Sequence, residues 1–277
     1  MHILLPPSEG KCFPEAGPVL ELQNLSFPEL TEARRRVLEV LIDVSKRDDA
    51  AKILKVGKRI ISEVEAQRDI LRMPCAPAWK VYNGVLYQAA QLRSNDDVMI
   101  FSGLFGLTSA HDLIPGYRLS MNIALPGIGS LTSFWRRELA KTDLSRSAFH
   151  RERQLSAMKG TSESLETTEA TKTTKITETT VDMRSGAYQV TAPQGQSWDL
   201  RVVDSRGKVI THAAKHYRGL LTRALLDAQQ SEQSDVASDS AEIGNAKASI
   251  DVAQVARSLG TIRVAHDGRH HHITLSI

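Results

Sequence analysis

The sequence predicts a single α+β domain in which helices surround a mixed sheet. Three observations lead to this prediction. The 277 residues are 41% hydrophobic and 24% charged, the usual balance of a globular chain with a sizeable core. Short apolar runs of strand length are mixed with longer segments of helical periodicity along the whole chain. No internal repeat is present, so residues 1–277 are interpreted as one domain.

The first half of the chain begins with a strand. Residues 2–5 are an apolar run that Pro6 and Pro7 stop, which is typical of a short buried strand. Ser130 precedes an apolar-periodic segment and is expected to cap it. By the same criteria we expect helices at 31–45, 50–72 and 130–141, a turn that continues into a helix at 80–93, and a second buried strand at 98–101.

Two segments of biased composition interrupt the second half. Nine of the twenty residues in 161–180 are Thr, and 229–247 is rich in Gln, Ser, Asp and Ala, so both are expected to be exposed, mobile loop inserts. Asp267-Gly268 is a hairpin signal. The remaining elements are predicted to be helices at 212–228 and 248–259, and strands at 188–191, 198–203, 208–211, 261–265 and 272–277.

Charge and composition limit the function classes. The formal net charge is only +3, but residues 31–60 hold nine basic and five acidic side chains, which fits either a phosphate-attracting surface or a solvated helix face. No apolar stretch is long enough for a membrane span, and the first residues lack the basic region of a signal peptide. Two cysteines are too few for a disulfide framework, so we expect a cytoplasmic protein.

A small polar loop follows the first predicted strand. Ser8, Glu9 and Lys11 offer a hydroxyl, a carboxylate and an ammonium, and Gly10 lets the backbone come close to a ligand. Ligands often bind where a strand ends at a sheet edge, so this loop is a candidate phosphate or carboxylate site. The alternative is a polar turn capped by Ser8.

A second candidate is the segment Leu125 to Gly129, spelled LPGIG. It resembles the hairpin of helix-hairpin-helix motifs, in which Gly127 and Gly129 would allow a tight turn and the next helix would bind DNA phosphate through backbone N–H groups. Arg136 and Arg137 follow on that helix. An ordinary glycine turn that leads into a core helix is the alternative.

A glycine-rich segment follows the second predicted strand, at residues 102–108, and permits close approach of the backbone. Asp112 and Arg118 come after it and are expected to form a buried ion pair, although Arg118 is also suited to an anionic ligand. Cys12 and Cys75 have no CxxC partners and the histidines lack a metal-site pattern, so we expect neither a metal site nor a cofactor.

Several segments together resemble the YaaA family of peroxide stress proteins. The matching segments run in order through the chain: Leu4 to Lys11, Tyr82 to Tyr87, Ser102 to Gly106, Asp112 to Met121, Phe134-Trp135, Asp182 to Tyr188 and Ala214 to Gly219. The resemblance implies a cytosolic protein with that family's α+β fold, including a helix-hairpin-helix-like element. It also implies a part in the peroxide response, in limiting iron-dependent damage, and in binding duplex or branched DNA through a basic cleft.

Two functional hypotheses follow. In the first, the protein binds DNA with little sequence preference, and phosphates contact Lys11, Lys55, Lys58, Arg59, Arg118, Gly127, Gly129, Arg136, Arg137, Arg184, Lys215 and Arg218. In the second, it is an enzyme for a nucleobase or a small anionic substrate, with a pocket built from Ser8, Glu9, Lys11, Arg118 and Arg218. The candidate catalytic residues are then Ser8, Glu9, Lys11, Tyr82 and Asp112.

Overall fold

A computed structural model shows a seven-stranded mixed sheet, in the order β10-β11-β9-β8-β1-β3-β4. It describes residues 1–142, 179–193, 195–238 and 250–277. The N-terminal strand β1 (His2–Leu5) lies in the interior of the sheet, parallel to β3 (Met99–Ser102) on one side and to β8 (Thr179–Asp182) on the other. Its apolar run fits this place, because a strand covered on both faces has no exposed side.

The remaining strands extend the sheet or form two small separate sheets. β4 (Gly106–Ser109) pairs with β3, and β9 (Gln196–Val203), β11 (His270–Ser276) and β10 (Thr261–Asp267) continue beyond β8. The two-stranded sheets pair β2 (Ala76–Pro77) with β5 (Leu113–Ile114) and β6 (Ala124–Leu125) with β7 (Gly129–Ser130).

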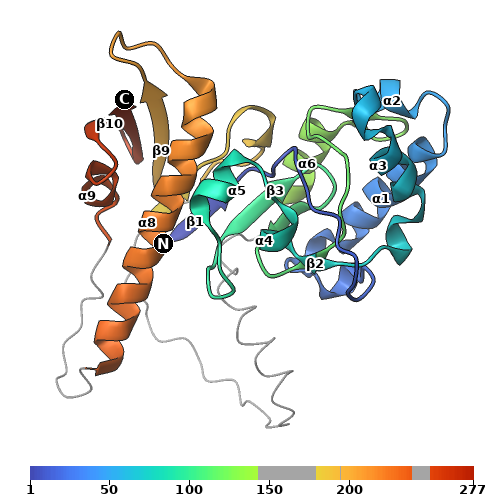
Figure 1. Ribbon diagram of the computed structural model, residues 1–277, viewed down its shortest axis with the longest axis horizontal. Helices are drawn as coiled ribbons and strands as arrows, with labels where there is room; N and C mark the ends of the chain where they lie inside the picture. The colour runs from blue at the N-terminus through green and yellow to red at the C-terminus, as the bar shows by residue number, and fades with distance from the viewer. Residues whose placement is uncertain (143–178, 194, 239–249) are drawn as a thin grey trace.

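Helices pack around this sheet (Figure 1). The long helix α8 (Thr211–Ser238) crosses one face beside α5 (Val85–Ala90), and α9 (Val252–Arg257) lies near the C-terminal strands. At the opposite end of the molecule lie α1 (Thr31–Ser45), α2 (Ala50–Ile53) and α3 (Ile61–Ala66), with α4 (Ala78–Val81) and α6 (Leu131–Leu139) between them and α8. Short 3-10 helices are η1 (Leu22–Asn24), η2 (Pro28–Leu30), η3 (Lys58–Ile60), η4 (Gln67–Arg72) and η6 (Gly186–Tyr188).

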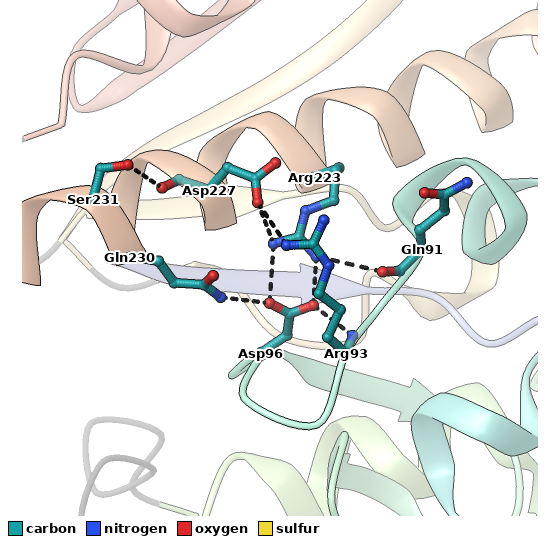
Figure 2. Close-up of polar contacts among 7 residues, drawn as sticks. All are labelled: Gln91, Arg93, Asp96, Arg223, Asp227, Gln230 and Ser231. Carbon is teal, nitrogen blue, oxygen red and sulfur yellow. Dashed lines mark hydrogen bonds and ion pairs between the residues drawn. The ribbon is translucent and has the colours of Figure 1, made fainter. Parts of the chain in front are cut away.

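A polar network anchors α8 to the turn that precedes β3 (Figure 2). The buried carboxylate of Asp96 accepts hydrogen bonds from both terminal nitrogens of Arg223, at 2.6 and 3.1 Å, and from the amide of Gln230, at 2.8 Å. The backbone N–H of Arg93 donates to the same carboxylate at 2.7 Å. Because every donor in this set comes from α8 or from the turn itself, Asp96 fixes where the helix lies along the sheet.

Most of the elements predicted for the described residues are present. The strand at the N-terminus, the helices at 31–45 and 130–141 and the C-terminal hairpin are confirmed, and Ser130 caps α6 by accepting a hydrogen bond from the backbone of Ser133. The prediction of one helix over 50–72 is wrong. The chain turns at Lys55, whose φ of 52° lies in the left-handed region, and continues after Gly57 as short helical pieces.

Other boundaries are wrong in the second half. The predicted strand at 188–191 is not formed, because Tyr188 ends a 3-10 helix, and 208–211 makes only one bridge, between Val203 and Val209. The predicted loop at 229–247 begins as helix, since α8 continues to Ser238. Thr179 and Thr180 of the insert predicted at 161–180 lie in β8, and residues 161–178 and 239–247 of the two predicted inserts lie outside the described residues. In the described part of the chain, no helix has the length and apolar character needed to cross a membrane.

Candidate functional site

The candidate site lies at the carboxyl ends of three parallel strands. β8, β1 and β3 are adjacent and parallel, so the chain leaves all three at the same edge of the sheet. The polar loop of residues 6–11 follows β1 there. Crevices at such edges, where neighbouring connections run in opposite directions, are the usual ligand sites of open sheets containing parallel strands.

The loop after β1 is held in place by the segment 82–84. The backbone N–H of Asn83 donates to Ser8 Oγ at 3.2 Å, and Ser8 Oγ donates in turn to the carbonyl of Gly10. Lys11 pairs with Tyr82 through an antiparallel bridge. Gly84 is required for this contact, because a Cβ atom at that position would come within 2.7 Å of Ser8 Cβ. The loop is therefore a fixed element of the site.

The amine of Lys11 faces two phenol rings. Its Nζ donates to the carbonyl of Ser8 at 2.7 Å and lies 4.5 Å from the ring centroid of Tyr117 and 5.6 Å from that of Tyr82. Burial, helped by the positive charge of Arg118, lowers the pKa of this amine from 10.5 to about 7, against the opposing effect of the Glu9 and Glu63 carboxylates. Near neutral pH the amine therefore exists in both its charged and its neutral form.

The two tyrosines form a hydrogen-bonded pair. The hydroxyl oxygens of Tyr82 and Tyr117 are 2.8 Å apart, and the nearby Ser102 hydroxyl favours a lower pKa of both phenols. Burial raises the pKa of both phenols, so they remain protonated at neutral pH. Tyr87 stacks on Tyr82 with 5.2 Å between ring centroids and donates to the carbonyl of Pro6 at 2.8 Å. Phenols in this state act as proton donors.

Arg118 completes the cluster. Its Nε contacts the carboxylate of Glu63, and its Nη1 donates to the backbone carbonyl of Glu9. Its backbone N–H donates to Gln67 Oε1 at 2.7 Å. Below, the Lys11 centre means the side chains of Lys11, Tyr82, Tyr117 and Arg118 together with the Ser8 loop.

The predicted ion pair between Asp112 and Arg118 is not formed, because each residue has another partner. Asp112 accepts hydrogen bonds from the backbone and hydroxyl of Ser26, at 2.9 and 2.8 Å, and from the backbone of Ser109 at 3.0 Å. Burial raises the pKa of its carboxyl group. Asp112 is thus part of a buried turn and is not placed as a catalytic group.

Arg34 is a buried residue that reasoning from the sequence missed. Its guanidinium is fully buried and donates to the carbonyls of Ser26 and Leu107, at 2.6 Å each, and of Phe105, at 3.1 Å. Burial lowers its pKa to about 10. The sequence did indicate that Arg34 is buried, because position 34 lies one turn before Val37 and Leu38 on the apolar face of α1.

Three other predicted cations lie away from the Lys11 centre. Arg184 is buried and engages both carboxylate oxygens of Asp182, at 2.8 and 2.9 Å, so it is not accessible to DNA. Arg218 is half-buried on α8 and donates to the carbonyl of Leu200 at 3.2 Å. Lys215 is exposed on the same helix. Neither α8 cation contacts the Lys11 centre.

The glycine hairpin connects two strands. Residues 117–123 contain no helix, so the predicted helix-hairpin-helix geometry is not formed, and β6 and β7 enclose the turn instead. Gly127 and Gly129 have φ values of 71° and 80° and open space around them. Arg36 on α1 donates to the carbonyl of Gly127 at 3.1 Å. Arg36 and Arg137 lie over the same Phe134 ring, at 5.9 and 5.4 Å from its centroid, which brings Arg36 to the exposed Arg137 of α6.

The remaining predicted cations lie away from the Lys11 centre, and so does a hollow in the surface. Lys55, Lys58 and Arg59 are exposed around α2 and η3, at the opposite end of the molecule from α8 (Figure 1). A hollow of about 610 Å³ lies beside α6 and is lined by Arg136, Thr142, Asp182, Gln189 and Thr191, among others. Lys11 does not line it. Within the described ranges no three side chains of His, Cys, Asp or Glu are grouped as metal ligands.

Comparison with known proteins gives a consistent result. Residues 1–242 match a family described as "Peroxide stress protein YaaA". A UPF0246 protein of Corynebacterium efficiens is 31% identical over 286 aligned positions, which cover 100% of both chains. A UPF0246 protein of Streptomyces coelicolor is 31% identical over 82% of this chain and 83% of its own, and an uncharacterised protein of Campylobacter jejuni is 25% identical over 80% and 82%.

Proposed function

This chain belongs to the peroxide stress protein YaaA family, and from that premise we propose that it acts in the peroxide-stress response as an enzyme through the Lys11 centre. The substrate is a nucleobase or a small anionic molecule. In this proposal the neutral amine of Lys11 serves as base or nucleophile, and the paired phenols of Tyr82 and Tyr117 serve as proton donors. The reaction limits the iron-dependent damage that peroxide causes.

One observation supports this proposal above the others. In the described part of the chain, no carboxylate oxygen lies within ion-pair distance of Lys11 Nζ, although Glu63 is nearby, because Arg118 occupies that carboxylate. A lysine kept for its charge would be paired or solvated. An amine that has no carboxylate partner, whose pKa burial lowers and that lies against two phenol rings is typical of a reactive site.

The test is survival under hydrogen peroxide. In cells from which the gene is deleted, full-length Lys11→Met and Lys11→Arg are expected to protect no better than an empty vector, because neither variant has a neutral amine. Lys80→Met is the matched control, since Lys80 also lies near an aromatic ring, 5.0 Å from the ring of Trp79, but is exposed. An iron chelator is expected to remove the difference between strains. Full protection by Lys11→Met would refute the proposal.

DNA binding is a second candidate, which the exposed glycine hairpin favours. Arg36 bonds to this open backbone turn, and Arg36 and Arg137 lie over the same Phe134 ring, at 5.9 and 5.4 Å from its centroid, while Arg136 is exposed on the same helix as Arg137. Such a group is suited to sequence-independent phosphate contacts. This candidate does not depend on the Lys11 centre, so the two functions are separable by mutation.

The hairpin is tested by salt-dependent binding to a labelled duplex. Replacing Arg136 and Arg137 together by Gln is expected to weaken binding several-fold and to lower the slope of log affinity against log salt by about 2. The control is the double variant Lys55→Gln and Lys58→Gln, which removes the same charge from another exposed surface. Equal losses in both double variants would show that only net charge matters, and no binding by the wild-type protein at low salt would exclude this function.

A further inference from the structure

Lys11 differs from the paired lysines of this chain in its partners. Lys141 and Lys46 lie 2.7 and 3.5 Å from the carboxylates of Glu138 and Asp43. The Lys11 amine instead has a backbone carbonyl on one side and the faces of two tyrosine rings on the other. Among the described residues, no carboxylate therefore holds the ammonium in a salt bridge, and the lone pair becomes available when the proton is lost.

The groups around the amine supply what a carbonyl condensation needs. The hydroxyls of Tyr82 and Tyr117 share one hydrogen bond, so the pair can deliver one proton and recover it elsewhere. Arg118 is close enough to act electrostatically on Lys11, and the Glu9 and Glu63 carboxylates act on it with the opposite sign. Glu63 and the carbonyl of Glu9 occupy the Nε and Nη1 of Arg118, and among the described residues its Nη2 has no hydrogen-bond partner, so a substrate carboxylate can bind there.

We propose that Lys11 reacts covalently, its Nζ forming an imine with a small aldehyde or keto compound that carries a carboxylate. This inference rests on the proposed enzyme function and names its chemistry. The amine nitrogen attacks the carbonyl carbon and a C–N bond forms, which gives a carbinolamine. The C–O bond then breaks, and the oxygen leaves as water with the two protons that the amine gives up. The tyrosine pair carries the protons from nitrogen to oxygen. The condensation releases water, and nothing is oxidised or reduced.

The probe is glyoxylate, the smallest aldehyde with a carboxylate, used with sodium cyanoborohydride on the full-length protein. Reduction fixes the imine as a secondary amine, and peptide mass spectrometry locates the added carboxymethyl group. At pH 7 we expect labelling of Lys11 to be at least about tenfold faster than labelling of exposed Lys80, because an ordinary lysine is almost wholly protonated at that pH. Acetaldehyde, which lacks the charge, is expected to label Lys11 more slowly than glyoxylate does.

Four outcomes are informative. Labelling of Lys11 no faster than that of Lys80 overturns the inference, because the wild-type protein is folded in this assay. Equal rates with acetaldehyde and glyoxylate overturn the requirement for a carboxylate. Tyr117→Phe is expected to slow the labelling of Lys11 several-fold, since it breaks the proton-carrying pair. If Lys11→Met loses peroxide protection but Lys11 of the wild-type protein is not selectively labelled, the proposed imine is wrong and the proposed enzyme function remains.

Discussion

Lys11→Met is expected to make the protein more stable at pH 6, by roughly 1–3 kcal/mol in the free energy of unfolding, while it removes the proposed function. The wild-type side chain pays a desolvation cost that a thioether avoids. The pKa of Lys11 is about 7 in the folded state, against 10.5 for a lysine in an unfolded chain. Between these values the unfolded state binds more protons, so wild-type stability rises with pH and the advantage of the variant shrinks towards pH 10.

Urea denaturation at several pH values measures this effect. Lys80→Met is the control and is expected to stay within about 0.5 kcal/mol of wild type at every pH, because its side chain is exposed. A variant that is destabilised at pH 6, or whose advantage does not depend on pH, would show that Lys11 is charged and structural. A gain in stability joined to a loss of peroxide protection is the mark of a residue retained for chemistry.

Arg184→Met is expected to lower the free energy of unfolding by about 3–5 kcal/mol, since it leaves the Asp182 carboxylate buried without its charged partner. The guanidinium also donates to the carbonyl of Thr191 at 2.8 Å and lies 4.1 Å from the ring centroid of Phe101. Because these contacts join the end of β8 to the following loop, the loss is measurable by urea denaturation at pH 7.

A double-mutant cycle separates the ion pair from its surroundings. Adding Asp182→Leu to Arg184→Met is expected to recover much of the loss, because replacing both partners of a buried pair by apolar groups is often nearly neutral. Arg137→Met is the control for an exposed pair with Glu138 and is expected to cost less than about 1 kcal/mol. If the two single arginine variants lose equal stability, burial of the Asp182 pair has no energetic consequence.

The parts of the fold that the sequence predicted are those with strong local signals. The apolar run at 2–5 and the periodic face of 31–45 determine their elements without help from distant residues. Residues 106–109 were missed as a strand because Gly103 and Gly106 indicate a loop that permits close approach of the backbone. In the structure Gly106 packs against Trp135, where a Cβ atom would come within 2.5 Å of the indole ring. That partner lies 29 positions along the chain and no local pattern reveals it.

The residues of the site could be predicted from the sequence in part, but their partners could not. The Ser8 to Lys11 loop, Tyr82 and Arg118 were singled out from residue type and position, and the structure brings them together. The partner of Arg118 was not predicted, since choosing Glu63 over Asp112 depends on how a helix 55 positions away packs. Arg218 was grouped with these residues by residue type alone, although its contact is with β9.

The interior position of β1 has a consequence for synthesis on the ribosome. This strand is made well before its two neighbours in the sheet, since β3 and β8 begin only at residues 99 and 179. Until β8 has left the exit tunnel, the nascent chain exposes an apolar strand with an open edge, which is the kind of surface that aggregates or recruits chaperones. Productive folding is therefore expected to wait for translation of the second half, and prematurely terminated chains are expected to be degraded.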